Sequence, residues 1–163
     1  MNRPLAIGLV LFAIQAVLVG IYLAVDRSAA APFQAEILDL PAPIVSFEQD
    51  GPLVLGNTPT VVHFWATWCG PCLTELPALL AASDEGELRL IAATDEPWPV
   101  IEAHFGGNVP PQIARDPEGT ARTAFSVSGL PDTFIVSDGR IRGRVGGPRD
   151  WSSEEARAWL MGE

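Results

Sequence analysis

The sequence of 163 residues contains no lysine, only two cysteines and only two histidines. The absence of lysine excludes chemistry that uses a lysine amine as a nucleophile or Schiff base. Its 10 basic residues, all arginines, are outnumbered by 20 aspartates and glutamates, and all but one of these acids follow residue 27. Such an acidic surface repels phosphate backbones and does not favour anionic lipid, which argues against a nucleic-acid partner.

The two cysteines, Cys69 and Cys72, are too few to staple a small scaffold. A disulfide across so short a loop contributes little loop-closure entropy, so the spacing favours a reactive pair over a structural one. A structural zinc site needs four ligands, and His63 and His104 would have to converge on the cysteines to supply them. Nothing in the spacing supports that convergence, so we predict redox chemistry and no metal site.

The opening segment differs sharply from the rest of the chain. Residues 4–25 carry no charge, and as a helix they rise about 33 Å, enough to cross a bilayer core of about 30 Å. This predicts a single transmembrane anchor, followed by a flexible linker at 26–35. Arg3 and the N-terminal amine favour a cytoplasmic location for residues 1–3 and export of everything after residue 26. The alternative is a cleaved signal peptide with an A-x-A-like site at 29–31, although the apolar stretch is long for one.

Residues 36–163 have the pattern of one α/β domain. The run at 60–66 is continuously β-branched and aromatic, which predicts a central buried strand. Asp138-Gly139 is the strongest hairpin signal, and Ser152 with Glu155 fits a capping box that opens the last helix. We expect a mixed central sheet with helices on both faces. The expected elements are strands at 36–40 and 44–48 (edge strands or a hairpin), a strand at 60–66, a helix at 70–83, a strand at 88–93, helices at 98–105 and 117–126, a hairpin of 132–137 with 140–145, and a helix from 152.

The residues from Trp68 to Cys72 read WCGPC, at the junction of the buried strand and the next helix. Two intervening residues let both sulfurs meet across one helical turn, so a disulfide can form and break with little backbone movement. Pro71 suits the first helical turn, where its missing N–H would be unpaired anyway. Cys69 faces free N–H groups and the positive end of the helix dipole, which favour a thiolate. We predict that Cys69 attacks a substrate disulfide and that Cys72 resolves the mixed disulfide.

A wider stretch carries a family resemblance. The residues from Thr60 to Pro77 (TVVHFWATWCGPCLTELP) resemble the thioredoxin superfamily, and the C-x-x-E-x-P that follows the core resembles its membrane-anchored TlpA/ResA/CcmG (DsbE) branch. A second signature, SGLPDTF at 128–134, is similar to the same branch. The resemblance covers 36–163 and implies a thioredoxin-like fold, with Pro131 cis and beside the cysteines. The sequence alone would favour an ordinary loop proline, because cis bonds are a minority.

Two positions on the expected helix refine this interpretation. Pro77 lies inside the helical pattern, which predicts a lost hydrogen bond and a kink. Glu75 falls where ResA-like members carry a glutamate near the thiols. It either takes and returns a proton during exchange, raising thiol pKa values by like-charge interaction, or is a solvated helix residue.

His63 is the notable departure from the family, because thioredoxin itself carries a buried acid at this position. On the strand, His63 shares a face with Val61 and Trp65. A neutral imidazole there would accept the proton of Cys72, and an imidazolium would stabilise a thiolate. The alternative is a core histidine hydrogen-bonded to neighbouring backbone. His104 is expected only to end a surface helix.

The resemblance implies a thiol–disulfide oxidoreductase held by one span in the inner (cytoplasmic) membrane, with its catalytic domain in the periplasm or outside the cell. It further implies a reductant in cytochrome c or copper-oxidase maturation. The partners would be protein disulfide substrates and a membrane electron donor, with no cofactor, because the dithiol is itself the redox carrier. An extended substrate segment would dock on a surface formed by Trp68, Gly70, Pro71, Leu130 and Pro131.

Two alternatives to this function remain. In a tethered copper-binding metallochaperone, both thiolates would hold Cu(I), but no Met or His beside the motif supplies a third ligand. Within the enzyme class, an oxidase or isomerase is open because the direction of electron flow depends on the reduction potential, which the sequence does not fix.

Overall fold

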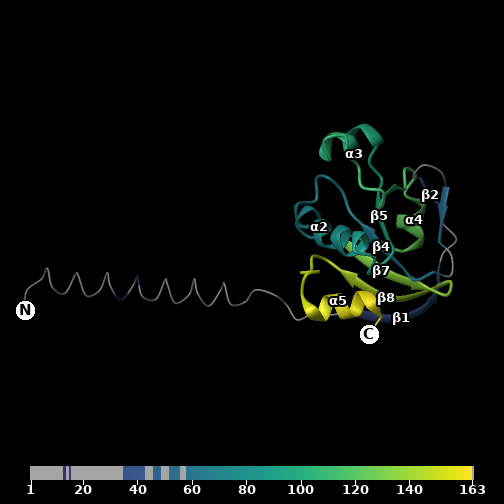
Figure 1. Ribbon diagram of the computed structural model, residues 1–163. Coiled ribbons are helices and arrows are strands. Elements are labelled where there is room, and N and C mark those ends of the chain that lie inside the picture. Colours follow the sequence, from purple (N-terminus) through teal and green to yellow (C-terminus); the bar gives the residue numbers. More distant parts are fainter. Residues whose placement is uncertain are drawn as a thin grey trace, which may run out of the picture. The chain divides into compact units, whose positions relative to one another are not determined.

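The computed structural model describes residues 35–42, 46–48, 52–55 and 58–162, together with Ala13 and Gln15. The chain divides into two units, Met1–Pro32 and Phe33–Glu163 (Figure 1). The anchor expected at 4–25 lies outside the described residues apart from Ala13 and Gln15, which are helical, and so does nearly all of the linker. Among the helices that are described, none has the length and apolar character needed to cross a membrane.

The second unit is built on a mixed sheet whose described strands follow the order β1-β8-β7-β4-β5-β6-β2-β3. The parallel pairs are β4 with β5 and β5 with β6, and the other neighbours are antiparallel. The strands are β1 (Glu36–Pro41), β2 (Ser46–Glu48), β3 (Pro52–Val54), β4 (Thr60–Phe64), β5 (Leu90–Thr94), β6 (Ile113–Arg115), β7 (Asp132–Ser137) and β8 (Arg140–Gly146). The helices are α2 (Gly70–Asp84), α3 (Trp98–His104), α4 (Thr120–Ala124) and α5 (Glu154–Met161).

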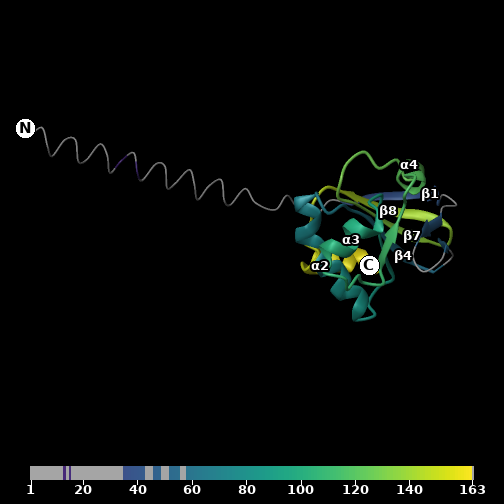
Figure 2. The ribbon, with the colours of Figure 1, turned by 90° about the horizontal axis from the view of Figure 1, so that it is seen from above.

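Helices cover both faces of the sheet, as Figure 2 shows with α4 on one side of the strands and α2 and α3 on the other. Alternation along β4 sends Val61 to one face and Val62 and Phe64 to the other. The first face packs against α2, α3 and α5 through Leu76, Leu79, Ile101, Ala156 and Leu160. The second packs against Ala121 of α4 and Phe125, which follows it. The expected α/β architecture with a mixed sheet is therefore confirmed, and β4 lies buried at its centre.

Most expected elements are confirmed within a few residues of their expected ends. The hairpin of β7 and β8 turns at Asp138 and Gly139, both with positive φ of 53° and 68°, as the turn type demands. Pro77 lies inside α2, as expected from the sequence. α3 ends at His104, which is exposed, so the expected role of this histidine is confirmed.

The hairpin interpretation of the first two strands is wrong. β1 is an edge strand but pairs with β8, whereas β2 pairs with β3 and β6 at the opposite end of the sheet. Two prolines, Pro41 and Pro43, separate the segments, and such residues give no information on which distant strand a segment will join.

Three further details correct the sequence-based expectations. β3 falls in the turn-rich stretch 51–59, where no strand was expected, and β6 was not expected either. Both have three residues, too few to show a period, and are defined by pairing with their neighbours. The N-cap of α5 is Ser153, whose hydroxyl accepts the N–H of Ala156. Ser152 instead bonds to Asp150.

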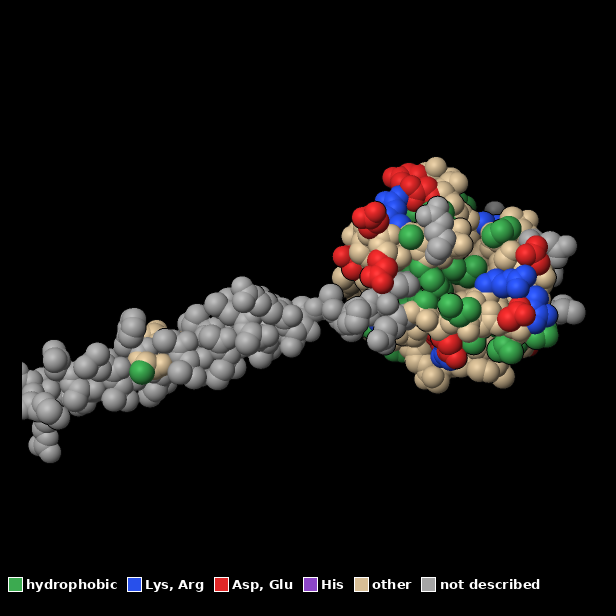
Figure 3. Space-filling model, turned by 90° about the horizontal axis from the view of Figure 1, so that it is seen from below, with side chains coloured by type: hydrophobic (Ala, Val, Ile, Leu, Met, Phe, Trp, Pro, Cys, Tyr) green, Lys and Arg blue, Asp and Glu red, His purple; other side chains and the backbone are tan. Residues whose placement is uncertain are grey.

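The surface near β1 mixes both charge signs despite the acidic composition. Asp39 contacts Arg140 and Arg142 of β8, and Arg142 also reaches Asp138 at 3.4 Å. Figure 3 shows charged side chains of opposite sign adjoining on the face it presents. Exposed ion pairs of this kind contribute little, about 0–1 kcal/mol each, so they are not what holds the edge strand in place.

Candidate active site

The two cysteines lie at the start of α2, directly after the chain leaves the buried strand β4. Cys69 is the N-cap residue, and its sulfur accepts the N–H of Cys72 at 3.3 Å. The two sulfurs form a disulfide with a Cα–Cα distance of 5.2 Å. Cys69 keeps 6% of its surface exposed and Cys72 keeps none. The more accessible cysteine therefore sits at the positive end of the helix, where a thiolate is favoured.

Of the residues expected to border a docking surface, Pro131 is buried and the others keep some exposure. Trp68 is 69% exposed, and Gly70 and Pro71 are also exposed. The peptide bond between Leu130 and Pro131 is cis, as the resemblance implies. Because β7 pairs antiparallel with β4, the loop that carries Pro131 ends at the same edge of the sheet as the loop that carries the cysteines.

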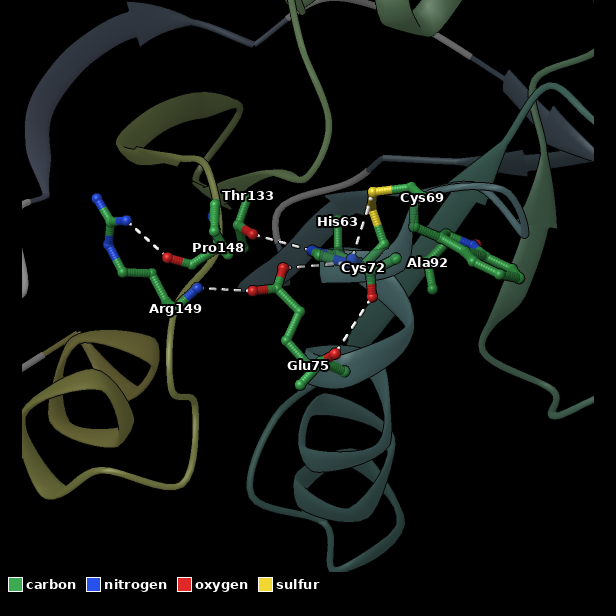
Figure 4. Close-up of polar contacts among 11 residues, drawn as sticks. His63, Cys69, Cys72, Glu75, Ala92, Thr133, Pro148 and Arg149 are labelled. Atoms are coloured by element: carbon green, nitrogen blue, oxygen red, sulfur yellow. Dashed lines mark hydrogen bonds and ion pairs between the residues drawn. A yellow bond between two sulfur atoms is a disulfide. The ribbon is translucent and has the colours of Figure 1, made fainter. Parts of the chain in front are cut away.

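Behind the cysteines lies a buried polar pair, His63 of β4 and Glu75 of α2 (Figure 4). His63 Nδ1 is 2.9 Å from Thr133 Oγ1, and His63 Nε2 is 3.7 Å from Glu75 Oε1. Neither Nε2 nor Oε1 has a hydrogen-bond partner among the described residues. The expectation that Glu75 is a solvated residue is wrong, since only 4% of it is exposed. The expectation that His63 bonds to neighbouring backbone is also wrong, because its partner is the Thr133 hydroxyl.

Burial shifts the pKa of both groups toward the uncharged form. The pKa of His63 falls from 6.5 to about 3 because the ring is fully desolvated. The pKa of Glu75 rises from 4.5 to about 7 through desolvation, although hydrogen bonds to Arg149 and Trp151 and the charge of Arg149 oppose the rise. The Arg149 N–H donates to Glu75 Oε2 at 2.7 Å. The imidazole is thus neutral near pH 7, where the carboxyl is able to bind or release a proton.

These two shifts predict opposing effects of pH on stability. Unfolded chains bind the His63 proton between about pH 6.5 and 3, so this group makes stability rise with pH. The folded protein holds the Glu75 proton up to about pH 7, so this group makes stability fall as pH rises from 4.5. In Glu75→Gln only the His63 effect remains, so the free energy of unfolding is expected to rise with pH by at most about 5 kcal/mol. In His63→Asn only the Glu75 effect remains, so the free energy of unfolding is expected to fall with pH by at most about 3 kcal/mol. Urea unfolding across pH 3–8 measures both, and identical slopes in wild type and variants would contradict the assignment.

The residues that sequence reasoning missed here are Thr133 and Arg149. Thr133 belongs to the second signature, and its register opposite His63 could have been found by pairing β7 with β4. Arg149 contributes a backbone N–H from a loop, for which no sequence signal exists. His104 does not join the site: its ring lies 4.8 Å from that of Phe105. Within the described ranges, no three metal-ligating side chains come together.

A mixed sheet with helices on both faces, a disulfide at a helix N-terminus and a cis-proline beside it define a dithiol protein of thioredoxin-like fold. No family model matches the chain. It is 32% identical over 92 residues to the thiol:disulfide interchange protein HelX of Rhodobacter capsulatus, covering 54% of this chain and 52% of that one. It is 33% identical over 106 residues to a thioredoxin of Mycolicibacterium smegmatis, covering 64% of this chain and 77% of that one.

The solved structures agree on the fold. A thiol:disulfide interchange protein DsbE from Chlorobium tepidum superimposes with a TM-score of 0.63 at 22% identity, over 76% of this chain and 95% of that one. The chain belongs to the thioredoxin superfamily. It spans 50–60% of the length of the interchange proteins HelX, DsbE and CycY that it matches.

Proposed function

We propose that this protein exchanges disulfides with protein substrates through Cys69 and Cys72. The observation that carries the proposal is the disulfide between an N-cap cysteine and a buried one, beside a cis-proline loop. The names of its relatives, thiol:disulfide interchange proteins and thioredoxins, support the same activity. The proposal needs no cofactor, because the dithiol is itself the carrier of electrons.

The exchange proceeds in two balanced steps. The Cys69 thiolate attacks one sulfur of a substrate disulfide, forming a mixed disulfide and releasing a substrate thiolate. The Cys72 thiolate then attacks Cys69 Sγ, closing the disulfide within this protein and releasing the second substrate thiolate. Two electrons pass to the substrate, and its two sulfurs take up protons. Cys69 fits the first role because it is the more exposed sulfur, and Cys72 fits the second because it is fully buried.

The buried pair supplies a route for the proton that Cys72 must lose before the second step. Glu75, with a pKa near 7, is ionised in part of the molecules and accepts a proton at neutral pH. His63 stays neutral, which disfavours the imidazolium interpretation. Its Nε2 lies 3.7 Å from the carboxyl, beyond a hydrogen bond, so Glu75 is the group proposed to take the proton.

The proposed docking surface is the one expected from the sequence, bordered by Trp68, Gly70, Pro71, Leu130 and Pro131. Pro131 is buried, so it would contribute the cis bond and not exposed surface. Trp68, next to Cys69 in the chain, supplies an exposed aromatic ring. In the loop before β7, the partly exposed Leu130 precedes the cis bond. An extended substrate segment lying between them would present its disulfide to Cys69.

The proposal places this domain outside the cytoplasm, in the periplasm or its equivalent, on an inner-membrane anchor at 4–25. The uncharged stretch and the acidic domain that follows it support this arrangement. A membrane electron donor would keep the dithiol reduced. The family resemblance suggests cytochrome c or copper-oxidase maturation as the process served.

The topology makes a direct prediction. A reporter that is active only outside the cytoplasm, fused after the last residue, is expected to be active, and the protein is expected to sediment with membranes. A control fusion after residue 3 is expected to be inactive. A mature chain that begins after residue 31 would show that the segment is a cleaved signal instead.

The test of the activity is insulin reduction by the reduced protein, with its reduction potential measured in glutathione buffers. A reductant is expected to reduce insulin and to have a potential near or below that of thioredoxin, about −270 mV. Titration of the reduced protein with Cu(I) distinguishes the metallochaperone: tight stoichiometric copper binding without insulin reduction would overturn the proposed function.

A further inference from the structure

The short segment 65–69, which joins β4 to α2 and carries Trp68 and Cys69, is anchored by a carboxylate from another strand end. The N–H of Thr67 donates to Glu96 Oε2 at 2.6 Å, and the Thr67 hydroxyl donates to Glu96 Oε1 at 2.6 Å. Both oxygens of one carboxylate therefore hold one residue. Two contacts to one carboxyl group restrain the segment more than a single hydrogen bond would.

Glu96 is itself fixed to the sheet from two directions. The Thr94 hydroxyl at the end of β5 donates to Glu96 Oε2 at 3.3 Å and accepts the Glu96 N–H at 3.4 Å. From β6, Arg115 Nε donates to the Glu96 carbonyl oxygen at 2.9 Å. The guanidinium of Arg115 also lies 5.8 Å from the ring centroid of Trp98. Because Glu96 is bonded to β5 and β6, its contact with Thr67 fixes the position of Thr67 relative to these two strands.

The other contacts of segment 65–69 hold its two ends. Trp65 bonds to Ala92 and Ala93 of β5 through its indole and backbone N–H groups. The Cys69 N–H bonds to the carbonyl of Ala66 within the segment. Cys69 is tied to α2 by the disulfide and by accepting the N–H groups of Cys72 and Leu73. Thr67 is thus the point between these two ends at which the segment is tied to the loop after β5.

We propose that Glu96 is a positioning residue that fixes Trp68 relative to the Pro131 loop, so that a folded protein disulfide can dock on both. This inference rests on the proposed exchange function and deepens it. A docking partner must contact Trp68 and the Pro131 loop together, so freedom of segment 65–69 weakens its binding. A small disulfide needs only the Cys69 sulfur, so the same freedom hardly affects it.

The test compares kcat/KM for insulin and for a small aromatic disulfide, 5,5′-dithiobis(2-nitrobenzoate), in four variants. Glu96→Ala is expected to lower kcat/KM for insulin about tenfold, mainly through KM, and to leave the small disulfide within about twofold. Glu96→Gln keeps an acceptor for the Thr67 N–H and adds a donor to its hydroxyl, so it is expected to restore most of the insulin rate. Thr67→Ala removes one of the two bonds and is expected to show a smaller loss.

The matched control is Glu102→Ala, which removes one exposed carboxylate from α3 without touching Thr67; it is expected to behave as wild type. If Glu96→Ala does not fold, Thr67→Ala carries the comparison. Equal losses on both substrates, a failure of Glu96→Gln to rescue, or no loss at all would overturn the inference. Inactivity of the wild type on both substrates would instead overturn the proposed function.

Discussion

Cys72→Ser is expected to accumulate covalent mixed disulfides with protein partners, whereas Cys69→Ser accumulates none and loses exchange activity to background. The reason is the difference between the two sulfurs. Cys69 is the N-cap of α2 and retains some exposure, and Cys72 is fully buried one turn inward. Removing the buried thiol leaves the attack intact but blocks the second step, so the mixed disulfide persists.

Non-reducing gels of whole cells, followed by reduction in a second dimension, measure this difference. The double variant Cys69→Ser with Cys72→Ser is the control for disulfides formed by other proteins. Equal trapping by both single variants would remove the assigned roles and indicate that either sulfur reaches substrate.

The second large effect is expected at His63. His63→Asp would place a carboxyl in the fully buried position of a ring that now lies 3.7 Å from Glu75. Two neighbouring carboxyls disfavour any further negative charge, so the macroscopic pKa values of the cysteine pair are expected to rise by about 1–2 units. His63→Asn adds no charge and is expected to change them less. Thiolate absorbance against pH measures the values in the reduced protein.

The neutral variant Glu75→Gln supplies the matched control for this experiment. In the double variant His63→Asp with Glu75→Gln, the neighbouring carboxyl is gone, and part of the rise is expected to disappear. If His63 only packs and bonds to Thr133, another pattern follows: His63→Asp and His63→Asn both lose stability, while the thiolate titration stays within error of wild type. That pattern would falsify a role for His63 in proton transfer.

Local features of the site could be predicted from the sequence because each depends on neighbours in the chain. The WCGPC motif after a continuous apolar run placed Cys69 at a helix N-terminus, and Asp138-Gly139 placed the hairpin. The central position of β4 followed from its continuous run of apolar residues, which do not alternate with polar ones. A strand with such a run is covered on both faces of the sheet. The cis bond before Pro131 came from the family resemblance alone.

The environment of the site was decided by tertiary structure, because its contacts join distant residues. Thr133 lies 70 positions from His63, and Arg149 lies 74 from Glu75. The sequence placed His63 and Glu75 near the thiols but could not bring them together, nor assign either a pKa, because desolvation depends on what covers a group.

Strand length explains why β4 and β7 were expected from the sequence and β3 and β6 were not. β4 and β7 carry enough residues for their patterns to be read from the sequence. β3 and β6 have three residues each and exist because a neighbouring strand offers its hydrogen-bonding edge. The contact between Glu96 and Thr67 arises in the same way, from loops at the ends of two parallel strands. Sequence determined the reactive pair, because its chemistry lies within one helical turn, whereas burial and strand pairing, which only the folded chain possesses, determined what surrounds it.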